Sequence, residues 1–355
     1  MATDVGVASP GRTHRTWHAL RDVKGHLRKS ALKLVGYLVV AYLILRLIPT
    51  LNEALHSLKQ VSWEWIVGAI LLEVISETGF VIAWREIVDP DRVLDADGRG
   101  FRMDQRVAWA QLGGGLLVPG GSLGGMGVGG WILHRFGMTT KVIAERQFNL
   151  SFLNTAVDAL AMIVFGIGLA AGIFAGEDNL LLTLLPAALA VCGVALALFI
   201  AGRAKRRGDP AQAEHPKFAR TISTLADAVN DTKRLVLSRA GLPAVLGAVA
   251  YLGFDLLILW LALFAVHAHP DPAFGVVVMA YIIGALGGSV PLPASVGTIG
   301  GIAGMLIVYG THHNPAVAAV LLHQAIGLVV PLAGGTVAYF VIRRKLGPGE
   351  SGSAT

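Results

Sequence analysis

The order of apolar and polar stretches along the chain predicts an all-α protein built around a membrane. Six apolar stretches approach or exceed the length needed to cross the hydrocarbon core of a bilayer, which is roughly 30 Å thick and takes about 20 helical residues. They lie near residues 33–50, 63–86, 148–175, 180–201, 242–267 and 315–342. Charged residues gather in the gaps between these stretches. The pattern predicts six transmembrane helices joined by loops in water.

Two more apolar stretches, 107–133 and 274–311, are broken in the middle by glycine and proline. As a helix, the arm from Val107 to Val118 would extend about 18 Å, which is too short to cross. We therefore expect two re-entrant hairpins. The candidate residues of the first turn are Pro119, Gly120, Gly121, Ser122, Gly124 and Gly125. Those of the second turn are Pro291, Pro293, Ser295 and Gly297.

The basic residues predict how the chain is oriented in the membrane. If both termini are cytoplasmic, all but two of the 29 lysines and arginines fall on the cytoplasmic side. The exceptions are Arg46, near a helix end, and Lys59, in a loop. Cytoplasmic loops of membrane proteins carry an excess of these residues. The sequence thus predicts a multi-pass protein with cytoplasmic N- and C-termini.

This threading divides the membrane region into halves of opposite orientation, about 33–175 and 180–342. The first hairpin opens to the cytoplasm and the second opens to the exterior. Paired broken segments in inverted halves indicate a transport site at the bilayer midplane. The alternative is that the glycines only permit close helix packing. We expect a basic cytoplasmic tail at 1–32, a membrane domain at 33–345 and a flexible tail at 346–355.

Composition and motifs exclude several classes of protein. Only 15% of the residues are charged, against about 25% in a typical soluble domain. The net charge of +6 does not indicate nucleic acid, because the basic residues flank apolar stretches. The glycine-rich segment has no strand–turn–helix context for a nucleotide. No nucleophile motif or recognised metal-ligand spacing occurs. We expect no cofactor, no metal and no catalytic residue.

Polar residues inside the apolar stretches are candidates for a functional cavity, because such residues usually face the interior of a helix bundle. Glu73 and Glu77 are four residues apart and share one helix face. Together these residues could form a path for a headgroup or a proton, or else a static hydrogen-bond network that fixes the helix register. The full set is Glu73, Glu77, Asn154, Asp158, Asp255, His323 and Gln324.

The two broken segments resemble conserved blocks of a family of bacterial membrane proteins. The first block continues through residues 131–135 and 144–146, and the second through 321–324 and Pro331. The family is the flippase-like domain of lysylphosphatidylglycerol synthases, which also occurs alone. The resemblance runs from about residue 30 to 345 and does not include a synthase domain.

The chain departs from the family pattern at several positions. The family often carries charged residues where this chain has Gly129, Asn149, Gly300 and Gln324. Ala294 and Ser295 stand where the family usually has two glycines. Headgroup contacts made by the family's charges therefore do not carry over to these positions.

The resemblance implies a protein of the bacterial inner membrane that moves an amphiphilic phospholipid or lipid-linked precursor between leaflets. Its expected partners are membrane lipids, in particular anionic phospholipid headgroups, and it is expected not to be an enzyme. The alternative is a non-transporting membrane scaffold or partner of a separately encoded enzyme that modifies lipids or glycans.

Overall fold

The computed structural model describes nine stretches of the chain. They are residues 61–95, 101–117, 122–176, 179–204, 226–227, 229–234, 238–268, 271–286 and 296–346. All of them belong to one compact unit, Ser57–Thr355. Within these stretches the regular structure is helical, and no strand occurs.

Nine α-helices and two short 3-10 helices have defined bounds. They are α3 (Trp63–Val88), η1 (Val93–Asp95), α4 (Phe101–Leu117), α5 (Ser122–Arg135), α6 (Thr140–Ala170), α7 (Leu180–Ala204), η3 (Arg239–Gly241), α9 (Leu242–Ala265), α10 (Phe274–Ala285), α11 (Val296–Val308) and α12 (His313–Leu346). Residues 226–227 and 229–234 are also helical.

Five of the six predicted spans are confirmed as long apolar helices. Helices α3, α6, α7, α9 and α12 are each long and apolar enough to cross a membrane. The sixth, near 33–50, lies outside the described residues. Helix α6 begins at Thr140, eight residues before the predicted start at 148, because the helix continues into the polar segment that contains Lys141 and Arg146.

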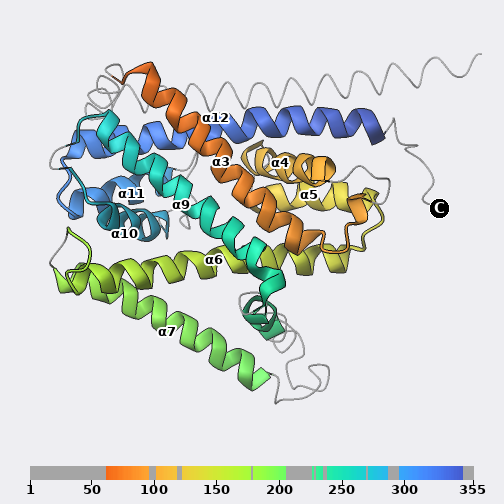
Figure 1. Cartoon of the computed structure of the whole chain (residues 1–355), viewed down its shortest axis with the longest axis horizontal. Coiled ribbons are helices and arrows are strands. Elements are labelled where there is room, and N and C mark those ends of the chain that lie inside the picture. Colours follow the sequence, from red (N-terminus) through yellow and green to blue (C-terminus); the bar gives the residue numbers. More distant parts are fainter. Residues whose placement is uncertain are drawn as a thin grey trace, which may run out of the picture. The chain divides into compact units, whose positions relative to one another are not determined.

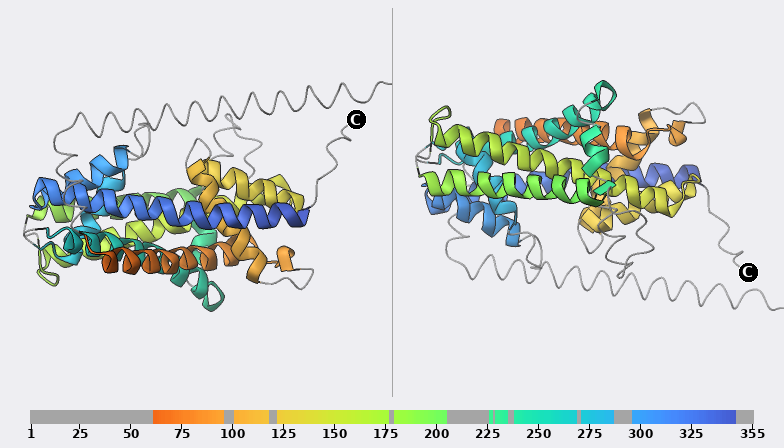
Figure 2. Two further views of the ribbon diagram at one scale, coloured as in Figure 1. Left: turned by 90° about the horizontal axis from the view of Figure 1, so that it is seen from above. Right: turned by 90° about the horizontal axis from the view of Figure 1, so that it is seen from below.

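Each of the two broken stretches forms a pair of shorter helices. Helices α4 and α5 pack against each other, and so do α10 and α11. The α10 and α11 helices are apolar but shorter than the five candidate spans. In Figure 2 the two pairs lie toward opposite ends of the long helices. Residues 118–121 and 287–295, which contain most of the predicted turns, lie outside the described residues.

Helices α3 and α9 form the most extensive contact in this unit and run antiparallel (Figure 1). Glycine allows the two backbones to meet. A Cβ atom on Gly79 would lie 2.7 Å from the carbonyl oxygen of Gly247, and a Cβ on Gly247 would lie 2.6 Å from the carbonyl oxygen of Gly79. The hydroxyl of Ser76 donates to the carbonyl oxygen of Tyr251 across the same crossing, at 2.8 Å. Small residues thus bring the two helices into backbone contact.

The remaining helices pack around this crossing in two sets. Helix α12 contacts α4, α9, α11 and α3, and helix α6 contacts α10, α3, α5 and α9. Helix α7 packs against α6 near the turn that joins them and diverges from it toward its own C-terminal end (Figure 1). A buried core that includes Trp84, Met103, Leu133 and Val278 joins several of these helices.

Many large apolar side chains lie on the outer surface of this unit, in contrast to the surface of a soluble protein. Leu181, Leu189 and Leu196 of α7 are each more than half exposed, whereas Glu73 and Glu77 of α3 are buried. A large exposed apolar surface needs a lipid or protein partner. Long helices with apolar outer faces and buried carboxyl groups are the arrangement expected in a bilayer.

Candidate functional site

The polar centre of the unit is built on Asp255 of α9. One carboxylate oxygen lies 2.8 Å from Nε2 of His323 on α12, and the other accepts a hydrogen bond from the hydroxyl of Tyr281 on α10. The His323 side chain is 5% exposed and that of Asp255 is 19% exposed. Residues far apart in the sequence therefore meet around one carboxylate, which remains partly accessible.

Glu73 and Glu77 of α3 extend this centre on a second side. Both are buried, at 4% and 3% exposure. Glu73 is close to α12, because its Oε1 atom lies 3.7 Å from the position of a Cβ on Gly327, one turn beyond His323. Electrostatic interactions connect Glu73 to Asp255 and His323, and Glu77 to Glu73 and Asp255.

Asp158 of α6 completes the set that we call the acidic cluster: Glu73, Glu77, Asp158, Asp255, His323 and Tyr281. Asp158 interacts electrostatically with Asp255. The sequence places no lysine or arginine in residues 63–84, 147–170, 242–265, 274–286 or 313–342. The acidic cluster itself therefore contains four carboxyl groups and a single imidazole, with no lysine or arginine in the helical segments that form it.

Two buried polar atoms of the acidic cluster have no hydrogen-bond partner among the described residues. They are Oε2 of Glu77 and Nδ1 of His323. Buried polar atoms in proteins are nearly always hydrogen-bonded to protein or ordered water. Each of these atoms, one on α3 and one on α12, is therefore a point at which a water molecule, a proton or a ligand would satisfy a buried polar group.

The structure brings together five of the predicted site residues in the acidic cluster: Glu73, Glu77, Asp158, Asp255 and His323. Asn154 and Gln324 are half-buried, next to cluster residues on α6 and α12. Gly124 and Gly125 are buried in α5, and Gly297 lies in the first turn of α11. Pro119, Gly120, Gly121, Pro291, Pro293, Ser295 and the side chain of Ser122 lie outside the described residues.

A glutamine network that the sequence did not reveal lies between α3, α4 and α6. Gln111 and Gln147 exchange hydrogen bonds of 2.8 and 2.6 Å, and Nε1 of Trp84 donates to Oε1 of Gln111 at 2.9 Å. All three side chains are buried. A closed set of buried hydrogen bonds fixes the packing of these helices.

Replacing Gln111 by leucine should destabilise the protein, because Trp84 and Gln147 lose their partner. Each buried group left unpaired costs about 1–3 kcal/mol. The double variant Gln111→Leu/Gln147→Leu should lose less stability than the two single substitutions added together, because it removes both carboxamides and leaves neither one unpaired. Unfolding temperatures in detergent measure both effects. Strict additivity of the two substitutions would contradict the network.

Gly129 is one of the neutral positions noted in the sequence, and the glutamine network explains it. A Cβ on Gly129 would collide with the side chain of Gln111, so a large side chain has no room there. Asn149 instead donates to Asp231 at 3.4 Å. Gly300 is exposed, with open space around its Cβ position. None of these three positions contributes to the acidic cluster.

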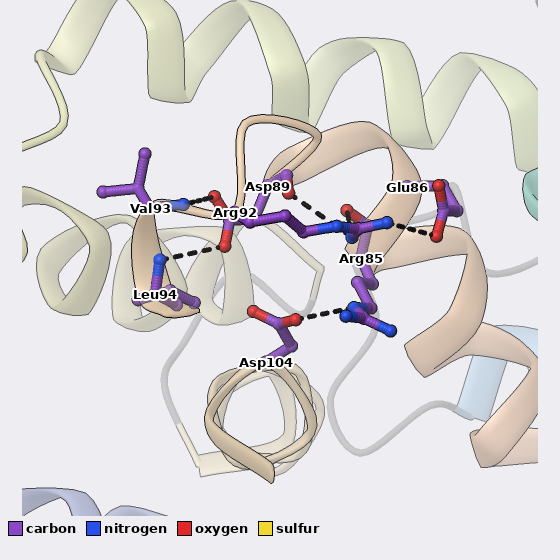
Figure 3. A network of polar contacts seen from close by, with 7 residues as sticks. All are labelled: Arg85, Glu86, Asp89, Arg92, Val93, Leu94 and Asp104. Atoms are coloured by element: carbon purple, nitrogen blue, oxygen red, sulfur yellow. Dashed lines mark hydrogen bonds and ion pairs between the residues drawn. The ribbon is translucent and has the colours of Figure 1, made fainter. Parts of the chain in front are cut away.

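A second polar network occupies the junction between α3 and α4 (Figure 3). Nε of Arg85 donates to Asp104 at 2.8 Å. Arg92 donates to Glu86 at 2.7 Å. The carboxylate of Asp89 accepts the backbone N–H groups of Val93 and Leu94 at 2.8 and 3.1 Å. These contacts hold the chain as it leaves α3.

The stability of this junction should depend on pH through Asp104. Burial and the neighbouring Asp89 carboxyl raise the pKa of Asp104 from 3.8 to about 6, although the Arg85 guanidinium opposes the shift. A raised pKa in the folded state means that protonated Asp104 stabilises the fold. This stabilisation is fully present below about pH 4 and is lost as the pH rises through about 6. Asp104→Asn should flatten this part of the curve of unfolding temperature against pH. An unchanged curve would contradict the assignment.

A cavity of about 430 Å³ lies near this junction and away from the acidic cluster. Residues from α3, α6 and the helical segment 229–234 line it, including Glu86, Glu145, Arg146, Asn149 and Asp231. Arg146 is engaged with Asp91 and with the carbonyl oxygen of Val88. Within the described stretches, no group of three or more histidine, cysteine, aspartate or glutamate residues is arranged to hold a metal ion.

Long apolar helices, an apolar outer surface and a buried acidic centre define a multi-pass membrane protein. Comparison with protein families gives a more specific result. Residues 33–335 match the family described as the lysylphosphatidylglycerol synthase TM region, and the chain belongs to that family. No curated protein and no solved structure matches the chain.

Proposed function

We propose that this protein moves an amphiphilic lipid between the two leaflets of the bacterial inner membrane, with the headgroup passing the acidic cluster. The observation that carries this proposal is the joining of α3, α6, α9, α10 and α12 at one buried polar centre. Ionisable groups in transmembrane helices are costly and usually mark the path of a substrate or ion. Family membership in a lipid-related membrane region supports the same function.

The packing of the helices supports an inverted repeat in which α3 corresponds to α9, α4 and α5 to α10 and α11, and α6 to α12. Under this correspondence, the contact of α4 with α12 matches that of α10 with α6, and the contact of α3 with α6 matches that of α9 with α12. The reciprocal approach of Gly79 and Gly247 then lies on the axis of the repeat. Two such halves rocking about α3 and α9 would expose the cluster to each side in turn.

The distribution of basic residues supports cytoplasmic termini. In the proposed orientation, Asn179 and His313 lie at the external ends of helices and Arg135 lies at a cytoplasmic end. Single cysteines at 179 and 313, in a Cys192→Ser background, should therefore react with a membrane-impermeant maleimide on intact cells, whereas a cysteine at 135 should react only after permeabilisation. The opposite pattern would reverse the orientation.

The carboxyl groups of the acidic cluster indicate which kind of lipid headgroup would fit there. Its carboxyl groups accept hydrogen bonds and attract positive charge, while an anionic headgroup would be repelled wherever they are ionised. A headgroup with an ammonium group or several hydroxyl groups would therefore fit better than a simple anion. This proposal departs from the partner expected from the sequence, an anionic phospholipid headgroup.

Reconstitution tests the proposal. The protein would be placed in vesicles of phosphatidylethanolamine and phosphatidylglycerol that contain a trace of either lipid with a fluorescent acyl chain. Dithionite quenching then reports how fast the label reaches the outer leaflet. We expect faster exchange than in vesicles without protein, and faster exchange for phosphatidylethanolamine than for phosphatidylglycerol. Equal rates with and without protein for both lipids would favour the scaffold function.

A further inference from the structure

The acidic cluster contains more acid than the described residues around it can neutralise. Among the carboxyl groups of the cluster, Asp255 alone has a hydrogen-bonded base within the described part of the chain, His323. Glu73 and Glu77 are buried on the same helix face, and no lysine or arginine occurs in the helical segments that form the cluster. An ionised carboxylate without a counterion costs a few kcal/mol inside a membrane. The cluster therefore needs protons or a cation from outside.

The hydrogen-bonding around Asp255 is suited to holding and passing on a proton. Each of its oxygens faces one partner, Tyr281 on α10 or His323 on α12. The second ring nitrogen of His323 is buried and has no partner among the described residues. Because an imidazole can accept a proton on one nitrogen and release one from the other, His323 can relay a proton as well as fix Asp255.

Titratable groups face Asp255 from the helices packed against α9. They come from α3, α6, α10 and α12, with one tyrosine from α9 itself. Each interacts electrostatically with Asp255. The facing groups are Glu73, Glu77, Asp158, Tyr281, His323 and Tyr251. Because they lie on both proposed halves, a movement of one half against the other would change the distances that set their affinity for a proton.

We propose that the acidic cluster is a proton-binding site that couples lipid movement to the proton gradient across the membrane. A proton enters from one side and binds within the Asp255–His323 pair. The proton is released on the other side after the two halves have moved. Each cycle therefore takes up one proton and releases one proton, and no other bond is made or broken. This inference rests on the proposed lipid movement and adds its source of energy.

Reconstituted wild-type protein tests the coupling. Vesicles of phosphatidylethanolamine and phosphatidylglycerol would carry an acyl-labelled lipid, with potassium and valinomycin holding the membrane potential at zero. With one proton per lipid, a gradient of one pH unit supports up to about a tenfold ratio of label between the leaflets. Reversing the gradient should reverse the ratio. Pyranine inside the vesicles should report proton movement that depends on the protein.

The variant His323→Gln should lose the response to the gradient. His313→Gln is the matched control, because it makes the same imidazole-to-amide change at an exposed position of the same helix, α12. Gel filtration and the unfolding temperature establish that both variants are folded. The gradient measurements use the wild-type protein, so they remain decisive even if His323→Gln does not fold.

The outcomes separate the coupling from the lipid movement itself. An unequal distribution of labelled lipid between the leaflets that follows the pH gradient, together with proton flux, supports both the lipid movement and its coupling to protons. Translocation that is equal with and without a pH gradient, without proton flux, overturns the coupling and leaves the proposed function standing. Asymmetry driven by a sodium gradient alone also overturns the proton assignment. Absence of translocation under every gradient overturns both proposals.

Discussion

Asp255→Asn should abolish lipid translocation while the protein remains folded. Asparagine keeps a carbonyl oxygen for the hydroxyl of Tyr281, but it removes the negative charge that pairs with His323. The cluster then loses the carboxylate that is hydrogen-bonded to its imidazole. We expect the rate to fall by more than about tenfold, which corresponds to about 1.4 kcal/mol in the barrier. The dithionite assay in vesicles measures this rate.

The control for this prediction must separate charge from shape. Glu64→Gln changes a carboxyl group to an amide on α3, where the side chain is exposed, and should leave the rate unchanged. Tyr281→Phe keeps the ring beside His323 but removes the hydroxyl donor, so it should have an intermediate effect. A full rate in Asp255→Asn would indicate that the acidic cluster is a static network.

The second large effect is expected at the crossing of α3 and α9. In Gly247→Ala the new methyl group would lie 2.6 Å from the carbonyl oxygen of Gly79 and 2.8 Å from the backbone nitrogen of Ala83. Both atoms belong to the backbone, so the helices must move apart. Overpacking of this kind typically costs about 1–3 kcal/mol. The shift would also displace Glu77, two residues from Gly79, and lower transport.

A glycine on the same helix provides the comparison. Gly253 has open space at its Cβ position, so Gly253→Ala should be neutral or should stabilise α9 by up to about 1 kcal/mol through helix propensity. The difference between the unfolding temperatures of Gly247→Ala and Gly253→Ala measures how much the close contact of α3 and α9 contributes to stability. Equal effects of Gly247→Ala and Gly253→Ala would mean that the close contact is not needed.

Much of the fold could be predicted because lipid imposes a simple rule on sequence. A span must be apolar over its whole length, so hydropathy located α3, α6, α7, α9 and α12. It could not locate the true start of α6 at Thr140. A helix is held by its own backbone hydrogen bonds and can continue past the membrane surface into polar sequence.

The members of the site were easier to predict than their pairing. A carboxyl group inside an apolar run is conspicuous, so Asp255 was found, and His323 was found for the same reason. Their contact joins positions 68 residues apart, and only the packing of α9 against α12 determines it. Tyr281 was missed because a tyrosine in an apolar helix is ordinary.

The glutamine network was missed for a related reason. Gln111 and Gln147 are 36 residues apart, and each lies in a helix that also contains other polar residues. Neither residue is unusual in its own helix. Only the meeting of α4 and α6 beside Trp84 turns two ordinary side chains into a closed set of hydrogen bonds.

Photo-crosslinking tests whether a lipid headgroup enters the acidic cluster. A phosphatidylethanolamine analogue with a diazirine on its headgroup would be added to the protein in vesicles, irradiated and mapped by mass spectrometry. We expect the headgroup to enter the cluster and to give adducts at Glu73, Asp158 or Asp255 that unlabelled lipid competes away. Adducts confined to the exposed face of α7, around Leu189 and Leu196, would contradict it.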